Sequence, residues 1–378
     1  MKILHLTAST FWGGPERQML GLAQALPFEY QTFFASFAEN GRCQPFLEKT
    51  REAGFESYRI KSDTPHLQQA VGDISQLIRQ IDADVLLCHG YKSNLLGRLA
   101  ARTTNVPCVA VSRGWTGETW KVQFYDWLDR KHLRCMNRVV CVSTEQARRV
   151  RKTGVPASKI RVIKNAMRDE LLEPLHHSQR EKLANVVPHD RYVILGAGRL
   201  SPEKGYMYLV KSMVELVKQH PNVLLLLCGE GPERGAIEEF IRHHMLHDHV
   251  RLLGFRTDVD QLLAMAQVMI LPSLTEGLPN IALEAAARRI PTIATAVGGT
   301  PEIVKHLETG LLVPPEQENE ISRQIIWLMK NPHRAEQLVE NAQEHVVHEF
   351  SFRGQAAKYV ELFEELVAVP SAGGTWVC

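Results

Sequence analysis

The sequence lacks the features that mark several large classes of protein. None of its seven cysteines forms a CxxC pair, and no apolar run reaches the roughly 20 residues of a transmembrane helix. The start, MKILHLTAS, has too short an apolar run for a signal peptide. Its 44 lysine and arginine residues nearly balance 42 aspartate and glutamate residues, so no basic field points to nucleic acid. We therefore expect a cytoplasmic protein with reduced cysteines, whose contact with any membrane would be peripheral.

Length and pattern together predict two α/β domains. A chain of 378 residues can bury two cores of ordinary size. Short apolar runs alternate with helical patterns, which is typical of parallel sheets. Strands are expected at 2–8, 31–37, 56–60, 84–88, 107–112, 138–142 and 162–163, and, after a linker within 165–190, at 192–195, 223–227, 250–253, 268–271, 290–297 and 310–313. Helical patterns follow at 317–330, 332–348 and 352–368, and the tail 369–378 has no periodicity.

The stretch 268–299 is the most informative part of the chain. It contains a short apolar strand, a loop, a helix expected at 281–289 with Pro279 at its start, and a second strand. Glu276 lies just before this helix and Glu284 lies within it. Amides at a helix N-terminus attract phosphate, and carboxylates accept hydrogen bonds from sugar hydroxyls. The alternative is a helix whose early acidic residues merely favour its dipole.

Two further loops carry residues suited to phosphate. Gly13 and Gly14 follow the first strand, where small residues allow a phosphate to approach backbone amides, although the GxGxxG spacing of a dinucleotide site is missing. Arg199 and Lys204 flank the loop after the strand at 192–195. Arginine binds phosphate through a planar fork and lysine as a point charge. The alternatives are a tight turn and two solvated charges.

An ordered set of motifs resembles the retaining glycosyltransferases of family 4. The paired glutamates Glu276 and Glu284 within PSLTEGLPNIALEAAA match the signature of that family. The resemblance implies the GT-B architecture, in which two Rossmann-like domains face each other across a cleft. It implies an acceptor-binding domain at 1–170, a nucleotide-sugar-binding domain at 190–350 and a helix at 351–368 that returns to the first domain. The other matches are GGPER, GRLSPEKG at 198–205, CGEGPER at 228–234 and TGLLVPP at 309–315.

The resemblance also implies an activity and a role for each site residue. The enzyme would move a sugar from a nucleotide-sugar, UDP being preferred to GDP on family frequency, to a hydroxyl of a glycan or lipid-linked acceptor in cell-envelope glycoconjugate or polysaccharide biosynthesis. Arg199 and Lys204 would stabilise the leaving diphosphate, Glu276 would hold the donor sugar and Glu284 the ribose. With no nucleophilic carboxylate apparent, the acceptor would attack on the face that the diphosphate leaves. The remaining donor-site residues would be Gly13, Gly14, Gly229, Gly231, Pro232, Arg256, Gly277, Leu278, Pro279 and Asn280.

We expect neither a metal nor a cofactor, because the two DxD-like sequences have simpler explanations. The first, Asp82-Ala83-Asp84, is expected to form a turn. Asp258, in the sequence DVD, is well placed as a helix N-cap. Three other activities remain open: a nucleotide-sugar epimerase of the same fold, a dinucleotide-dependent oxidoreductase, which the missing GxGxxG disfavours, and a non-catalytic nucleotide-sugar-binding protein.

Arg113 departs from the family pattern, which usually has a histidine at this position. Arginine stays protonated and cannot act as a base, but it can bind an anion on the donor or the acceptor. Alternatively it pairs with Glu118 and has a structural role. His89 follows the strand at 84–88, where a side chain either enters the ligand crevice or forms a structural hydrogen bond. Together with Trp115, these are the acceptor-side candidates.

The segment 115–135 is rich in aromatic and basic residues. Trp120, Phe124, Trp127 and Leu128 recur at helical spacing. One interpretation is a helix at a membrane interface. The other, which we favour from the sequence, is a helix that packs its aromatic rings on the domain core. The basic residues at its end are Arg130, Lys131, His132 and Arg134.

Overall fold

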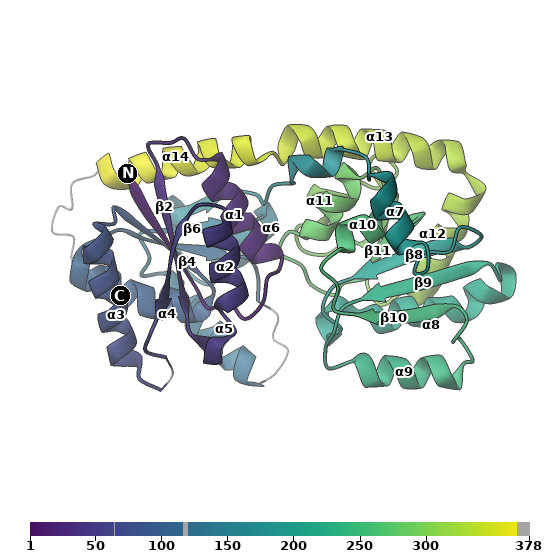
Figure 1. Cartoon of the computed structure of the whole chain (residues 1–378), viewed down its shortest axis with the longest axis horizontal. Helices are drawn as coiled ribbons and strands as arrows, with labels where there is room; N and C mark the ends of the chain where they lie inside the picture. Colours follow the sequence, from purple (N-terminus) through teal and green to yellow (C-terminus); the bar gives the residue numbers. More distant parts are fainter. Residues whose placement is uncertain (64, 116–119, 369–378) are drawn as a thin grey trace. The chain divides into compact units, whose positions relative to one another are not determined.

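A computed structural model describes residues 1–63, 65–115 and 120–368, and the side chains within 120–122 are not described. The chain divides into two compact units. The first contains Met1–Asn165 together with the C-terminal segment from Phe352, and the second contains Ala166–Ser351. Figure 1 shows both, each built around one parallel sheet.

The sheet of the first unit has seven parallel strands in the order β3-β2-β1-β4-β5-β6-β7. The chain adds strands outward from β1 to β3 on one side of the sheet and from β4 to β7 on the other, so the order reverses between β1 and β4. The strands are β1 Lys2–Thr7, β2 Gln31–Phe37, β3 Glu56–Ile60, β4 Val85–His89, β5 Cys108–Ser112, β6 Arg138–Cys141 and β7 Ile160–Val162.

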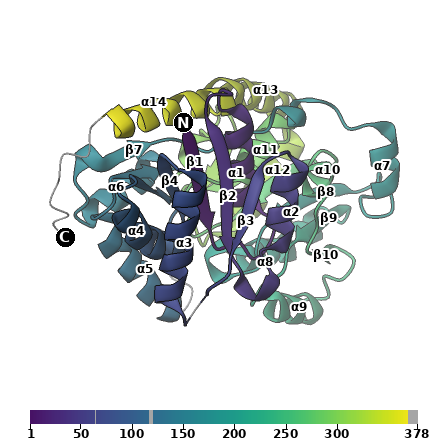
Figure 2. The same ribbon diagram turned by 60° about the vertical axis from the view of Figure 1, so that its left-hand side comes forward.

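Helices cover both faces of this sheet. Apolar residues of α3 and α4 pack with β1, β2, β4 and β5 in one core, and those of α1 and α2 pack with Phe34 of β2 in another. The last helix, α14, packs beside α1 in this same unit, as predicted for the C-terminal helix (Figure 2). The helices are α1 Gly14–Ala25, α2 Gln44–Glu52, α3 Leu67–Ile81, α4 Tyr91–Thr104, α5 Trp120–Leu133, α6 Thr144–Lys152 and α14 Phe352–Ala368, with short 3-10 turns η1 Glu39–Gly41 and η2 Ala157–Lys159.

The second unit repeats the plan with six parallel strands in the order β10-β9-β8-β11-β12-β13. Its core packs α8 (Tyr206–Gln219), α9 (Arg234–His243) and α12 (Glu318–Lys330) with the sheet. Here the order reverses between β8 and β11. The strands are β8 Tyr192–Ala197, β9 Val223–Cys228, β10 Val250–Gly254, β11 Val268–Leu271, β12 Thr292–Thr295 and β13 Leu311–Val313.

The predicted linker 165–190 is not without structure. It contains the 3-10 turn η3 Asp169–Leu172 and the helix α7 His177–Leu183. These elements bury isolated apolar side chains such as Leu171 and Leu183. Isolated apolar residues form no periodic pattern, so the sequence did not predict the two elements. The other helices of this unit are α8 Tyr206–Gln219, α9 Arg234–His243, α10 Val259–Leu263, α11 Asn280–Ala287, α12 Glu318–Lys330 and α13 Pro332–Glu349, with 3-10 turns η4 Pro202–Lys204 and η5 Thr300–Glu302.

Two Rossmann-like parallel sheets with helices on their faces confirm the predicted fold class. Among the described residues, no helix is both long enough and apolar enough to cross a membrane. The described free cysteines are all buried: Cys43, Cys88, Cys108, Cys141 and Cys228.

Candidate functional site

The clearest candidate site of the second unit lies where β8 and β11 end. Where the strand order of a parallel sheet reverses, the loops that leave the two neighbouring strands run to opposite sides. A crevice then forms between these loops at the carboxyl ends of the strands. Lys204, at the end of the β8 loop, and Glu276, in the β11 loop, meet there: Lys204 Nζ lies 2.6 Å from Glu276 Oε1. The Ser273 hydroxyl donates to the same carboxylate oxygen at 2.7 Å. The structure therefore brings together two of the predicted catalytic residues.

Backbone contacts fix the β11 loop against its neighbours. The Leu274 amide donates to the Glu203 carbonyl in the β8 loop at 2.8 Å. On the other side, Gly298 follows β12 with φ of +55°, and a Cβ at this position would lie 1.8 Å from the Glu276 carbonyl oxygen. The Gly299 amide also donates to the Gly277 carbonyl at 3.0 Å. Glu276 is therefore positioned by loops on both sides, and sequence reasoning missed Ser273 and Gly298 as supports of the site.

The β9 loop holds the backbone around Arg199. Gly229 has φ of +145°, and a Cβ here would lie 1.8 Å from the Gly198 carbonyl oxygen. The Leu200 amide donates to the Glu230 carbonyl at 3.0 Å. Gly229 and Gly231 were predicted to line a nucleotide pocket, and the structure shows that they pack directly on the β8 loop. The Arg199 side chain itself is exposed at this edge.

Glu284 is buried within α11, the helix that follows the loop carrying Glu276. Its Oε1 lies 3.5 Å from Arg168 Nη2, so its charge has a partner. The helix begins at Asn280, and Pro279 takes the N-cap position with extended backbone instead of the first helical position. Gly277 and Leu278 complete the loop between Glu276 and this helix.

The prediction for Asp258 is correct in position but wrong in mechanism. Asp258 is the N-cap residue of α10, yet its side chain accepts no hydrogen bond from the helix. Both carboxylate oxygens instead accept from Arg256, at 2.8 and 2.6 Å. This bidentate pair raises the pKa of Arg256 above its usual value. Arg256, expected among the donor-site residues, is thus held by an acid of its own loop.

In the first unit, Gly13 and Gly14 lie at the start of α1. Gly13 is the N-cap residue, and its amide donates to Glu16 Oε2 at 3.1 Å. Glu16 is buried, and burial is the main cause that raises the pKa of its carboxyl. Sequence reasoning did not identify Glu16, although a glutamate three residues after an N-cap is the signature of a capping box.

His89 and Arg113 lie on one small cavity of about 10 Å³, which is also lined by Gln18, Gln355 and Tyr359. His89 is buried at the end of β4, and its Nε2 lies 3.1 Å from Nδ1 of His5 in β1. The cavity is at the lower limit for one water molecule. His89 is therefore part of a buried hydrogen-bond network. Its partner His5, in the apolar strand β1, was not predicted from the sequence.

The charges in this network act on one another. Burial first, and the Arg113 charge second, lower the pKa of His5 to about 3. The same two causes lower the pKa of His89. Burial also lowers the pKa of Arg113, and its Nε has no hydrogen-bond partner among the described residues. Both histidines are thus neutral beside a cation. The alternative partner Glu118 lies outside the described residues.

Trp115 is tied to α5. Its Nε1 donates to Asp129 Oδ2 at 3.0 Å, and the Arg130 guanidinium lies 4.8 Å from its ring centroid. The expectation that α5 packs its aromatic rings on the core is wrong for Phe124 and Trp127, because both side chains are more than half exposed. Trp120 lies among the residues whose side chains are not described.

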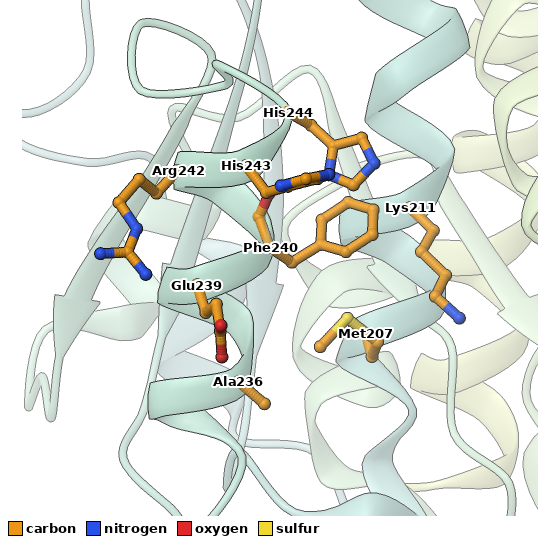
Figure 3. A pocket seen from close by; sticks show the side chains of 8 residues that line it. All are labelled: Met207, Lys211, Ala236, Glu239, Phe240, Arg242, His243 and His244. Carbon is orange, nitrogen blue, oxygen red and sulfur yellow. The ribbon is translucent and has the colours of Figure 1, made fainter.

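A separate pocket of about 640 Å³ lies between α8 and α9 on the second unit. Figure 3 shows Met207 and Phe240 facing each other across it, whereas the side chain of Arg242 points away. None of the predicted site residues lines this pocket.

Two family models match the chain in succession. The model described as Glycosyl transferase 4-like domain matches residues 13–166, and that described as Glycosyl transferases group 1 matches residues 178–345. Together they span most of both units.

Curated relatives are similar over different shares of their length. The chain is 26% identical over 325 residues to the UDP-Gal:alpha-D-GlcNAc-diphosphoundecaprenol alpha-1,3-galactosyltransferase of Escherichia coli, covering 83% of this chain and 84% of that protein. It is 28% identical over 230 residues to the lipopolysaccharide core biosynthesis glycosyltransferase LpsD of Rhizobium meliloti, covering 61% and 64%. With LpsD, and with the alpha-D-kanosaminyltransferase of Streptomyces kanamyceticus at 57%, the match spans less than two thirds of the relative.

Solved structures share the fold. HepE from Anabaena, in complex with UDP and glucose, superposes with a TM-score of 0.84 at 21% identity, covering 97% of this chain and 100% of that one. Sucrose-phosphate synthase from Thermosynechococcus elongatus gives 0.80 at 20% identity with the same coverage. The predicted family is confirmed by these matches: the chain belongs to the glycosyltransferases of the GT-B fold, with the two successive domains of a family 4 type.

Proposed function

We propose that this protein transfers a sugar, with retention of configuration and without a metal, from a UDP-sugar to a hydroxyl of a glycan or lipid-linked acceptor. The observation that carries the proposal is the Lys204–Glu276 pair between the ends of β8 and β11. The choice of UDP rests on HepE, which was solved with UDP and glucose. The choice of acceptor rests on the Escherichia coli relative, whose name specifies a lipid diphosphate.

The pair suggests how a donor would be received. Lys204 Nζ and Glu276 Oε1 form an ion pair at 2.6 Å. A diphosphate is a stronger partner for an ammonium group than a carboxylate, because it offers more charge and more acceptor oxygens. Lys204 would turn to the diphosphate, and Glu276 would become free to accept hydrogen bonds from sugar hydroxyls. Donor binding would thus replace the Lys204–Glu276 ion pair with two contacts to the donor, one from each residue.

Departure of the diphosphate is the difficult step, since its negative charge grows as the glycosidic bond breaks. Lys204, Arg199 and the amides at the start of α11 would stabilise that charge, a type of preorganised electrostatics that is commonly the largest contribution to catalysis. With the donor bound, Glu276 would hold sugar hydroxyls and keep the Ser273 hydrogen bond, so we assign it a positioning role and not that of a nucleophile. We infer that a diphosphate oxygen takes the acceptor proton as the acceptor attacks on the same face.

Two ion pairs support independence from metal. Asp258 is held in both oxygens by Arg256, and Asp260 Oδ2 lies 3.8 Å from Arg288. Each acid of the DVD sequence therefore faces a cation instead of an open coordination site.

A panel of nucleotide-sugars tests donor and metal requirements together. UDP-sugars should raise the melting temperature more than GDP-sugars do, because a ligand of the folded state stabilises it by mass action. Turnover of the preferred donor should continue in excess chelator, and the product linkage, read by NMR, should keep the donor configuration. Loss of activity in chelator with recovery in magnesium or manganese would contradict the metal-free mechanism.

Arg113 is proposed as an acceptor-side residue that binds an anionic group. The Arg113 guanidinium interacts with the charge of buried Glu16, yet its Nε has no hydrogen-bond partner among the described residues. An anionic group of the acceptor would supply that hydrogen bond through the planar fork of the guanidinium. Arg113→Lys should raise the KM for the acceptor on the order of 10-fold with little change in donor binding, because lysine keeps the charge but loses the fork. Unchanged acceptor KM in both Arg113→Lys and Arg113→His would show that Arg113 is structural.

A further inference from the structure

The helix α5 buries acidic side chains and exposes aromatic ones, the reverse of an ordinary surface helix. Residues three and seven positions apart share a helix face. Asp126, Asp129 and Leu133 form one such row and are buried. Phe124 and Trp127 lie on the opposite face, 54% and 53% exposed, in line with Lys131. The acids therefore point inward and the aromatic rings outward.

Buried hydrogen bonds explain this orientation. Asp129 accepts from the Asn94 side chain of α4 at 2.7 Å and from Trp115 Nε1 at 3.0 Å. Burial raises the pKa of Asp129, while these two hydrogen bonds and the nearby Arg130 charge act in the opposite direction. Leu133 is part of the core. Rotating the helix to bury its aromatic rings would break both hydrogen bonds, so the outward face is fixed by the fold.

The outward rings form a continuous patch with a neighbour from α4, which lies beside α5 (Figure 2). Tyr91 stacks on Tyr125 with ring centroids 4.7 Å apart. The ring centroid of Phe124 lies 5.9 Å from that of Tyr125 and 6.0 Å from that of Trp127. Lys131 Nζ lies 5.7 Å from the Trp127 ring. We call Tyr91, Phe124, Tyr125, Trp127 and Lys131 the aromatic patch. Exposed aromatic groups this close together mark an interaction surface.

We propose that the aromatic patch docks on a bilayer that contains anionic phospholipids. Tyrosine and tryptophan favour the boundary between headgroups and acyl chains, where the ring is apolar and its polar atom stays hydrated. Over 123–133, both acids are buried and Lys131 and Arg130 are exposed, so the face carries only positive charge outward. That charge complements anionic lipid, whereas two copies meeting on this face would oppose like charges.

Vesicle binding by the full chain tests the proposal. The wild type should sediment with vesicles of phosphatidylglycerol and phosphatidylcholine and should bind pure phosphatidylcholine at least tenfold less, with binding weakened by salt. Phe124→Ser combined with Trp127→Ser should lower binding to anionic vesicles tenfold or more. Lys131→Glu should lower it as well, without removing any ring. The matched control is Phe28→Ser, a 96% exposed phenylalanine of the same unit outside the patch, which should bind like the wild type.

Three results would overturn the proposal. They are absence of wild-type binding to anionic vesicles, wild-type binding by both the double serine variant and Lys131→Glu, and a dimer in sedimentation that dissociates when the patch is changed. Circular dichroism should show unchanged folding of every variant, since the altered side chains are exposed. The proposal does not rest on the sugar transfer, because vesicle binding and donor turnover are measured separately.

Discussion

Single residues in the first unit make its stability depend on pH. The folded pKa of His5 is lowered to about 3, and that of His89 is also lowered, from about 6.5 in an unfolded chain. Below about pH 6.5 the unfolded chain gains protons at these positions that the folded chain does not. Their effect is therefore absent above pH 6.5, and stability falls as pH drops from 6.5 toward 3.

We predict that His5→Gln flattens this dependence. Each histidine contributes a slope of up to about 1.4 kcal/mol per pH unit, so the free energy of unfolding should change less between pH 7.5 and 5 in the variant than in the wild type. Urea unfolding at the two pH values measures it. His348→Gln, at an exposed histidine, serves as the control and should behave like the wild type. Parallel losses in His5→Gln and the wild type would refute the assignment.

The sequence predicted residues better than it predicted their partners. Glu276 and Lys204 were identified by their motifs, but their ion pair joins positions 72 residues apart, and only the order of strands brings them together. His5 was missed because a lone histidine in an apolar strand carries no signal until its neighbour His89 is known. Asp258 was placed correctly at a helix start, yet the arginine two residues earlier takes its side chain.

At the scale of elements, the loop after β12 supports the loop that carries Glu276. Gly298→Ala should lower stability by about 1–2 kcal/mol, because alanine is disfavoured at its φ of +55°. It should also lower donor turnover, since a Cβ would collide with the Glu276 carbonyl at 1.8 Å and displace the loop. Urea unfolding and UDP release from the donor measure the two effects.

A second glycine provides the matched control for this change. Gly235 lies within α9, and a Cβ there meets no atom within 4 Å. Gly235→Ala should leave turnover unchanged and raise stability by up to about 1 kcal/mol, because alanine is the better helix residue. Equal turnover in Gly298→Ala and Gly235→Ala would contradict the supporting role of Gly298.

Helices were predicted well in extent and less well in orientation. The last three were expected at 317–330, 332–348 and 352–368 and lie at Glu318–Lys330, Pro332–Glu349 and Phe352–Ala368. For α5, the spacing of its rings located an apolar stripe, but the stripe faces outward because buried Asp129 satisfies Asn94 and Trp115 on the other side. Periodicity shows that a helix has two faces, and tertiary hydrogen bonds decide which one is buried.

At the scale of the whole molecule, alternating patterns predicted two parallel sheets because the inner strands, such as β4 and β9, are fully buried apolar runs. The strand order was not predictable from pattern, since it depends on which strands pair across long connections. The helix α14 shows the same limit: its Glu365 binds Arg138 and Arg161 of the first unit, more than 200 positions earlier. Its return to that unit was expected from the family resemblance alone.

The central claim is that the loops after β8 and β11 stabilise a departing nucleotide diphosphate. Its most direct test is the rate of UDP release from the preferred UDP-sugar and acceptor by Arg199→Ala, with Lys211→Ala, an exposed lysine of α8, as control. By analogy with loss of one oxyanion donor, we predict turnover on the order of 100-fold lower in Arg199→Ala and unchanged in Lys211→Ala. Near-normal turnover in a folded Arg199→Ala protein would contradict the account.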